Sequence, residues 1–159
     1  AAVAEQGRSS GNVALALIDL DHFKQINDTH GHVTGDQALR HIVSVVQAWL
    51  RPGDLFGRLG GEEFGLLLTG CAHDECVALA EHIREAVAAT PLRLEGEPVV
   101  VTASIGMAFT EQVGFDLSRL FHHADAALYA AKRADRNRVM TELTDDDLLG
   151  RSVRDPRPV

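Results

Sequence analysis

Short apolar runs alternate along the chain with stretches of one-sided apolar periodicity, and the two patterns predict strands and helices in turn. The apolar run Val13–Leu20, bounded by turn residues, is typical of a buried strand. Two shorter strands are predicted over residues 54–59 and 63–69. Because only a glycine-containing turn separates them, they are expected to form a β-hairpin. Further strands are predicted over residues 99–109 and from near Asn137.

Four helices are predicted between these strands. A short helix covers residues 22–28, and the glycines within residues 31–35 are expected to end it. Asp36 is then expected to cap a long second helix, which Pro52–Gly53 ends. The apolar positions of the three long helices are Leu39, Ile42, Val43, Val46, Trp49 and Leu50; Cys76, Leu79, Ala80, Ile83 and Val87; and Leu117, Leu120, Phe121, Ala124, Leu128 and Ala131.

The predicted order of elements is β-α-α-β-β-α-β-α-β, which indicates an α+β layered domain. The split βαβ arrangement favours a ferredoxin-like, palm-type fold, with a five-stranded, mostly antiparallel central sheet flanked by helices. A chain of 159 residues with 45% apolar residues suits one such domain. We assign residues 13–141 to it. Residues 1–12 are interpreted as the end of a truncated N-terminal helix with its loop, and residues 142–159 as a C-terminal tail.

Charge and cysteine content narrow the classes of partner. Fifteen basic and 23 acidic residues give a net charge of −8, which argues against general binding to nucleic acid or anionic membranes. An anionic substrate would need a metal ion or a few well-placed cations. Cys71 and Cys76 are too few for a disulfide framework, so we expect a cytoplasmic domain. Because the chain opens as if within a helix, a sensor or dimerisation region, with or without a membrane anchor, is expected upstream.

Two acidic segments are candidates for chemistry. Asp19-Leu20-Asp21 ends the first strand, and Gly60-Gly61-Glu62-Glu63 forms the hairpin turn. Taken separately, the first is also typical of a helix cap or surface pair, and the second of an ordinary glycine turn with solvated glutamates. Side by side in one sheet, they would supply carboxylates to one or two divalent metals. Palm-type nucleotidyl transferases use such an arrangement to activate a 3′-hydroxyl and neutralise a triphosphate.

The segment Arg58-Leu-Gly-Gly-Glu-Glu-Phe64 resembles the signature of the GGDEF family in its GGEEF form. The resemblance extends over about residues 13–140, because other segments match the family pattern in the same order. These segments are Asp19-Leu-Asp-His-Phe-Lys-Gln-Ile-Asn-Asp28, Gly31-His32, Gly35-Asp36, Thr102-Ala-Ser-Ile-Gly106, Ala124-Asp-Ala-Ala-Leu-Tyr-Ala-Ala-Lys132 and Arg136-Asn-Arg-Val139.

The resemblance implies a diguanylate cyclase, which condenses two GTP molecules into cyclic di-GMP and two pyrophosphates where the two halves of a homodimer meet. By position, the side chains of Asp19 and Glu62 and the carbonyl of Leu20 would bind metal. Two Mg²⁺ (or Mn²⁺) ions would be bound in each half-site with GTP. Glu62 would also help to remove the 3′-hydroxyl proton, and Glu63 would bind or orient the second metal.

The resemblance also assigns a substrate site, made of Phe23, Lys24, Asn27, Asp36, Lys132 and Arg136. Asn27 and Asp36 would read the guanine edge, because an Asp can accept from the guanine N–H donors and an Asn can both donate and accept. The cationic side chains would contact the phosphates. Gly60 and Gly61 would let the nucleotide approach the turn.

Arg51-Pro-Gly-Asp54 matches the position of the family's RxxD inhibitory site, where the product binds. RxxD is a common pattern, and only its position gives it weight here. The same residues also suit a helix whose C-terminus is capped by Arg51, followed by a strand that starts at Asp54. His82 stands where relatives often carry an arginine that supports inhibitor binding, so product inhibition stays open. Asp135 stands where the family usually has glycine, and the family's opening Asp-x-Leu-Thr-x-Leu-x-Asn-Arg segment is absent.

Two alternatives remain beside an active diguanylate cyclase. One is a non-catalytic regulatory domain that binds GTP or cyclic di-GMP, although such domains usually lack the signature acids. The other is a palm-type cyclase that makes cyclic AMP or cyclic GMP. Nucleotide binding without turnover would indicate the first, and competition by ATP would indicate the second.

Overall fold

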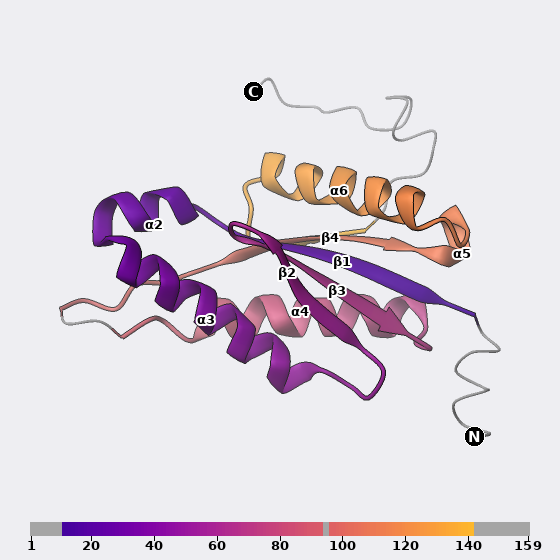
Figure 1. The fold of residues 1–159 in the computed structure, drawn as a ribbon, viewed down its shortest axis with the longest axis horizontal. Coiled ribbons are helices and arrows are strands. Elements are labelled where there is room, and N and C mark those ends of the chain that lie inside the picture. The colour runs from indigo at the N-terminus through magenta and orange to yellow at the C-terminus, as the bar shows by residue number, and fades with distance from the viewer. Residues whose placement is uncertain (1–10, 94–95, 142–159) are drawn as a thin grey trace.

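A computed structural model describes residues 11–93 and 96–141, which form a five-stranded sheet in the order β2-β3-β1-β4-β5 (Figure 1). Its strands are β1 (Val13–Leu20), β2 (Leu55–Gly60), β3 (Glu63–Thr69), β4 (Ala103–Phe109) and β5 (Val139–Met140). The central strand β1 pairs antiparallel with both β3 and β4, and only β4 and β5 pair in parallel. The predicted α+β fold with a mostly antiparallel five-stranded sheet is therefore confirmed.

Helices cover both faces of this sheet (Figure 1). They are α2 (Phe23–His30), α3 (His32–Trp49), α4 (His73–Ala89), α5 (Thr110–Val113) and α6 (Leu117–Arg133). Helices α3 and α4 lie against one face, and α6 lies against the other. The short α5 has no counterpart in the predicted order.

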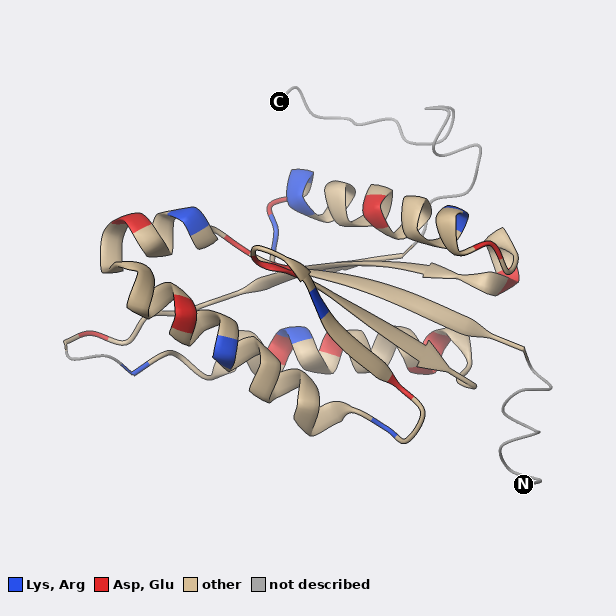
Figure 2. Ribbon diagram, viewed as in Figure 1, with Lys and Arg blue, Asp and Glu red and all other residues tan. Residues whose placement is uncertain are grey.

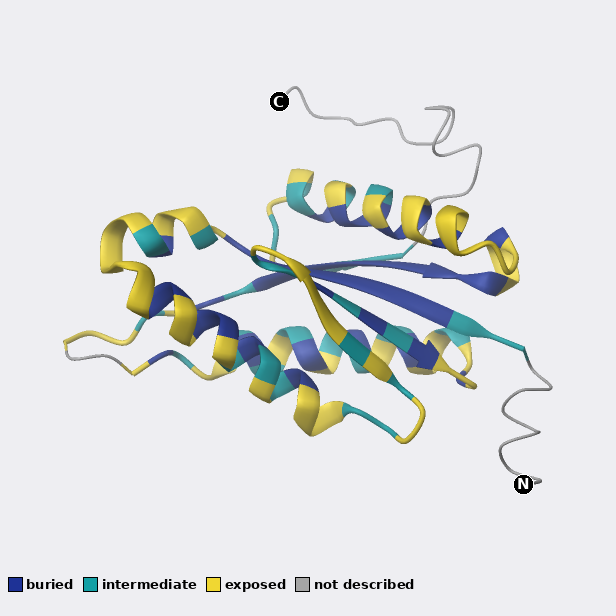
Figure 3. Cartoon of the chain, viewed as in Figure 1, coloured by how far each residue is buried: buried dark blue, intermediate teal, exposed yellow. Residues whose placement is uncertain are grey.

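Alternate residues of β1 enter different cores because successive strand side chains point to opposite faces. Ala16 and Ile18 belong to the larger core beneath α3 and α4, whereas Leu15 and Leu17 pack with residues of α5 and α6. Figure 3 shows burial along almost the whole of β1 and β4. This two-sided burial explains why β1 is an uninterrupted apolar run up to Asp19.

The sequence prediction misplaced the start of the long helix. Helix α3 begins at His32 with Gly31 as its N-cap, so Asp36 lies inside the helix and does not cap it. Gly35 is buried within α3, where a Cβ atom would collide with Oδ1 of Asn27. The glycine is therefore explained by a close approach between α2 and α3 and not by a break in the chain.

Other predicted boundaries and faces also need correction. Strand β4 begins at Ala103 and not at residue 99, since Val99 forms only an isolated bridge with Leu92. Trp49, Leu117 and Phe121 were predicted on buried helix faces, yet they are 39%, 69% and 42% exposed. Helix amphipathicity identified the buried stripe but not its edges.

The structure pairs Cys71 and Cys76 in a disulfide that the sequence analysis did not predict. No helix among residues 11–93 and 96–141 is long and apolar enough to cross a bilayer. The predicted C-terminal tail, residues 142–159, and most of the predicted N-terminal segment, residues 1–12, lie outside the described residues.

Candidate functional site

Strand pairing places the end of β1 beside the turn of the β2–β3 hairpin. Asp19 and Glu63 are direct partners in the antiparallel pairing of β1 and β3, and the Leu20 N–H donates to the carbonyl of Glu62 at 3.2 Å. The four residues predicted to bind metal therefore lie together. Figure 2 shows acidic residues gathered at this end of the sheet.

The turn itself depends on its two glycines. Gly61 has φ 51° and Gly60 has φ 154°, and a Cβ atom at either position would meet nothing within 4 Å. A left-handed φ such as that of Gly61 favours glycine. Arg58, for which the sequence analysis gave no role, donates from Nε to the Gly61 carbonyl at 2.8 Å. The turn is thus held by Arg58 and has open space beside both glycines.

Asp19 is a buried acid that is paired with a lysine. Its side chain accepts a hydrogen bond from Lys132, with Nζ 2.6 Å from Oδ2. Burial raises the pKa of Asp19 above its ordinary value, and the nearby Glu62 and Asp21 carboxylates raise it further. Lys132 opposes this shift without cancelling it.

Glu63 shows the same electrostatic stress. Burial raises its pKa, the charges of Asp19 and Asp125 raise it further, and Lys132 opposes the rise. Asp125 lies on α6 and was not assigned to the site from sequence. A cluster of carboxylates that resists full ionisation is stabilised by a cation placed among them.

The donors suit a metal ion that shares its coordination with a substrate. Among the residues that the structure describes, no three His, Cys, Asp or Glu side chains form a group able to hold a metal ion. A closed protein cage is therefore not present there. Mg²⁺ commonly takes only one or two protein carboxylates and completes its shell with water and substrate phosphates. Asp19 and Glu62, with the carbonyl of Leu20, fit that pattern.

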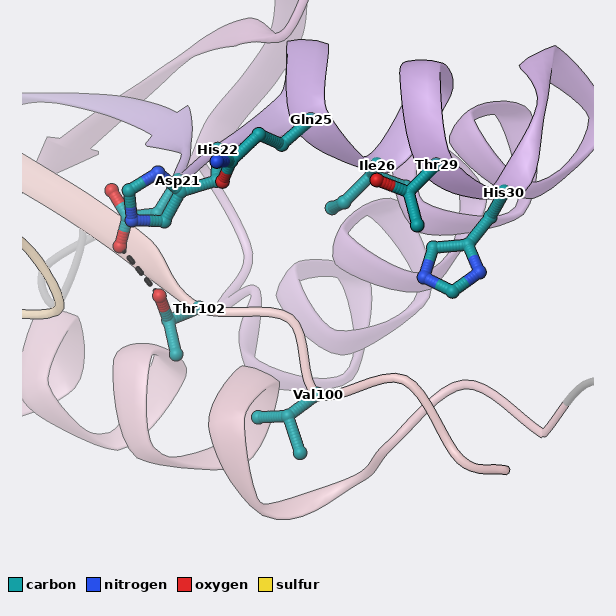
Figure 4. A pocket seen from close by; sticks show the side chains of 8 residues that line it. All are labelled: Asp21, His22, Gln25, Ile26, Thr29, His30, Val100 and Thr102. Carbon is teal, nitrogen blue, oxygen red and sulfur yellow. Dashed lines mark hydrogen bonds between the residues drawn. The ribbon is translucent and has the colours of Figure 1, made fainter.

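Asp21, the second acid of the Asp-x-Asp segment, is directed elsewhere. Its carboxylate accepts hydrogen bonds from the hydroxyl groups of Thr102 at 2.7 Å and Ser104 at 2.6 Å, and from the backbone N–H of Asn137 at 3.0 Å. Figure 4 shows the bond to Thr102 beside a pocket of about 400 Å³, where His22 and His30 also lie. Three donors already occupy this carboxylate, so Asp21 does not fit a metal ligand.

The residues predicted to read guanine lie on the two helices that follow β1. Asn27 is on α2, and Asp36 is exposed on α3. The Oδ1 atom of Asn27 is buried and has no hydrogen-bond partner among the described residues. An unpaired buried acceptor is costly, and a ligand N–H would satisfy it. Phe23 packs against the larger core, and Lys24 is exposed.

Arg136 lies in an unusual turn after α6. Asp135, Arg136 and Asn137 have φ values of 76°, 61° and 45°, so three consecutive non-glycine residues are left-handed. The Arg136 N–H donates to the carbonyl of Ala131 at 3.0 Å, and the Arg136 carbonyl accepts from Nε of Arg138 at 3.1 Å. The sequence signal at this turn is Asp135, which stands where the family usually has glycine and which tolerates a positive φ better than most residues.

Arg51 and Asp54 form a closed pair. Nε and Nη2 of Arg51 donate to the two carboxylate oxygens of Asp54, each at 3.0 Å, and the Arg51 N–H donates to Asp54 at 2.8 Å. The Asp54 side chain is 1% exposed and that of Arg51 38%. The pair precedes β2, whereas the glycine turn follows it. Nearby in sequence, Trp49 stacks on His82 with ring centroids 5.1 Å apart.

Comparison with known proteins gives consistent matches. Residues 1–138 match the family model described as "Diguanylate cyclase, GGDEF domain". The chain is 42% identical over 139 residues to the diguanylate cyclase DgcP of Pseudomonas aeruginosa, covering 86% of this chain and 20% of that protein. It is 43% identical over 132 residues to the probable diguanylate cyclase DgcT of Escherichia coli, covering 79% and 28%. The chain thus spans well under a third of the length of these two relatives.

Solved structures agree with the sequence matches. The GGDEF domain of DgcB from Caulobacter crescentus, in complex with c-di-GMP, is 36% identical with a TM-score of 0.78, covering 88% of this chain and 84% of that one. The active GGEEF domain of a diguanylate cyclase from Vibrio cholerae is 30% identical with a TM-score of 0.79, covering 91% and 92%. The match therefore extends over nearly the whole described fold.

Proposed function

This chain belongs to the GGDEF family of diguanylate cyclases, and on that premise we propose that it condenses two GTP molecules into cyclic di-GMP and two pyrophosphates. The observation that carries the proposal is the pairing of Asp19 with Glu63 across β1 and β3. This pairing gathers carboxylates whose raised pKa values mark a place for a cation. The chain retains every signature acid of the GGEEF form.

Each half-site would hold one GTP. Asn27, through its unpaired Oδ1, and Asp36 would receive the N–H donors of guanine. Lys24, Lys132 and Arg136 would contact the phosphates, while Gly60 and Gly61 leave room at the turn. The side chains of Asp19 and Glu62 and the carbonyl of Leu20 would hold the metal, and Glu63 would bind or orient a second one. When bound, Mg²⁺ or Mn²⁺ would acidify the ribose 3′-hydroxyl and neutralise charge on the triphosphate.

The proposed reaction consists of two equivalent displacements at phosphorus, each of which releases one pyrophosphate. The carboxylate of Glu62 takes the proton of one 3′-hydroxyl, and that oxygen attacks the α-phosphorus of the opposite GTP. The bond from the α-phosphorus to the bridging oxygen breaks, and pyrophosphate leaves. The 3′-hydroxyl of the second GTP then attacks the α-phosphorus of the first in the same way, which closes the ring and releases the second pyrophosphate. Because one chain presents one GTP, a homodimer is required, and an upstream sensor or dimerisation region would control its formation in the cytoplasm.

Product inhibition through Arg51 and Asp54 is expected to be weak. The Arg51 guanidinium is already engaged by Asp54 on both oxygens. At the position where relatives often carry an arginine, His82 stacks on Trp49 and supplies no permanent cation. At this position cyclic di-GMP would therefore find Arg51 already bound to Asp54, and the stacked rings of Trp49 and His82 in place of a second arginine.

The decisive experiment is a timed incubation of the chain with GTP and Mg²⁺ at several protein concentrations, with chromatographic identification of the products. We expect cyclic di-GMP, with a specific activity that rises with protein concentration because the active species is a dimer. Glu62→Gln should abolish product formation while the far-ultraviolet circular dichroism is unchanged. If the wild-type chain binds GTP but forms no product even when artificially dimerised, it is a nucleotide receptor and the proposal is wrong.

A further inference from the structure

The carboxylate of Asp21 joins three segments that are distant in the sequence. Its Oδ1 accepts from Ser104, and its Oδ2 accepts from Thr102 and from the backbone N–H of Asn137. Its own N–H donates to the Thr102 carbonyl at 2.9 Å. Asp21 is only 5% exposed. A buried carboxylate with this many donors is firmly fixed, since any loss would leave buried polar groups unpaired.

The bond to Asn137 reaches the strained turn after α6. Three consecutive non-glycine residues, 135–137, have φ between 45° and 76°. Such backbone costs energy at each residue and persists only where surrounding contacts hold it. Asn137 is held on two sides, because Asp21 accepts its N–H and Arg84 donates from Nη1 to its Oδ1 at 2.9 Å.

Arg136 stands in the middle of this turn, so its direction depends on the turn's conformation. The first turn residue, Asp135, has a side chain, whereas a glycine would adopt φ 76° freely. In this chain the conformation therefore relies on outside contacts more than it would with glycine at that position. The bond to Asp21 is a direct contact of this kind, and Asp21 lies two residues after Asp19 in the sequence.

We propose that Asp21 is a positioning residue that holds the left-handed turn 135–137 so that Arg136 meets the phosphates of GTP. This inference rests on the proposed function. Asp21 was not among the residues predicted to bind metal, and its carboxylate instead holds the backbone of this turn through the Asn137 N–H. Arg84, on α4, supports the same turn from the opposite side, and its own guanidinium is oriented by Glu81 at 2.9 Å.

Two substitutions test this role through the phosphates. Asp21→Ala removes all three acceptor contacts, and Asp21→Asn keeps the shape and one oxygen. We expect Asp21→Ala to weaken binding of GTP with Mg²⁺ about tenfold, the effect of losing one charge-assisted contact. Binding of guanosine, followed by NMR titration, should change by less than about twofold because guanosine carries no phosphate. Asp21→Asn should show the same contrast to a smaller extent.

Charge alone predicts the opposite sign. Removing a carboxylate near a bound triphosphate reduces repulsion and should strengthen GTP binding. Weaker binding would therefore identify loss of position and not loss of charge. Asp74→Asn is the matched control, since the Asp74 side chain is fully exposed at the start of α4. It should leave the affinities for both ligands unchanged.

A second substitution tests whether the turn is the link. Asp135→Gly lets the chain adopt the left-handed conformation without the outside contact, so adding it to Asp21→Ala should recover most of the lost GTP affinity. Equal losses of GTP and guanosine binding, or no recovery with Asp135→Gly, would overturn the inference. If Asp21→Ala does not fold, the same comparison is made with Asp21→Asn. Failure of the wild-type chain to bind GTP would instead refute the proposed function.

Discussion

The ammonium group of Lys132 lies 2.6 Å from Oδ2 of Asp19, which joins the last turn of α6 to the end of the central strand β1. These residues were predicted to have separate roles, one toward phosphate and the other toward metal. In the structure Lys132 supplies positive charge to a carboxylate that burial keeps from ionising easily. Binding of a metal ion would give Asp19 another cation and release Lys132 toward phosphate.

Lys132→Met should destabilise the metal-free chain at neutral pH. The side chain of Asp19 is 9% exposed and that of Lys132 is 36% exposed, so we expect a loss of about 1–2 kcal/mol and not the full cost of a buried pair. As the pH falls and Asp19 becomes protonated, the difference from wild type should shrink. Urea unfolding at several pH values measures both effects, and Lys24→Met is the control because Lys24 is an exposed residue of α2. A difference independent of pH would contradict the ion-pair explanation.

Glu63→Gln should stabilise the metal-free chain at neutral pH, by less than about 1 kcal/mol because Glu63 is only partly buried. The pKa of Glu63 is raised above its ordinary value of 4.5 in the folded chain. The folded chain therefore holds more protons than the unfolded chain just above pH 4.5, and the free energy of unfolding falls as the pH rises through that window. Glutamine carries no charge, so Glu63→Gln removes the destabilisation that comes from ionising Glu63 in the folded chain.

The measurement is the pH dependence of unfolding without divalent metal. The wild-type curve should fall more steeply above pH 4.5 than the Glu63→Gln curve, and the two should converge at lower pH. Adding Mg²⁺ with GTP should reverse the order at neutral pH, because the ligands stabilise only a site with its carboxylates intact. Parallel curves would show that Glu63 is not under electrostatic stress.

Local patterns were sufficient to predict the two elements that build the site, but not their pairing. The apolar run ending at Asp19 and the glycine turn at Gly60–Gly61 are both short-range signals, whereas the pairing of β1 with β3 was only a condition of the metal-site hypothesis. The contacts of Asp21 carry no such signal, because its partners Thr102, Ser104 and Asn137 lie 81, 83 and 116 positions away. Only the folded sheet brings them together.

Gly35 lies inside helix α3, although the glycines of residues 31–35 were predicted to interrupt the chain there. Clustered glycines usually interrupt helices, so residues 31–35 were predicted to be a break. In the structure Gly31 does cap α3, but Gly35 lies inside it. The reason for the second glycine is the side chain of Asn27, which needs the space that a Cβ atom would fill. Such a steric reason belongs to tertiary packing and leaves no periodic trace.

Gly35→Ala should weaken recognition of guanine while the fold persists. A Cβ atom at this position would collide with Oδ1 of Asn27 and force that side chain to move. We expect the affinity for GTP to fall by about tenfold, as for one lost hydrogen bond in a buried site, with less effect on ATP. Competition binding measures both nucleotides. Gly57→Ala is the matched control, because a Cβ atom there would meet nothing within 4 Å. Equal losses for both nucleotides would argue against a role in base recognition.

His82→Arg should strengthen inhibition by cyclic di-GMP. In the native chain the His82 ring stacks on Trp49, which lies two residues before Arg51 in the sequence. His82 itself supplies no permanent charge to the Arg51–Asp54 pair. An arginine would add a planar cation that can contact phosphate or the Hoogsteen edge of guanine, and it can still stack on Trp49. We expect the inhibitory concentration of cyclic di-GMP to fall about tenfold, as for one added charge-assisted contact, with unchanged initial rates.

His122→Arg, on the exposed side of α6, adds the same charge elsewhere and should have no effect. An unchanged inhibitory concentration in His82→Arg would mean that the product does not bind at this face, and the self-contained Arg51–Asp54 pair would then be a purely structural link between α3 and β2.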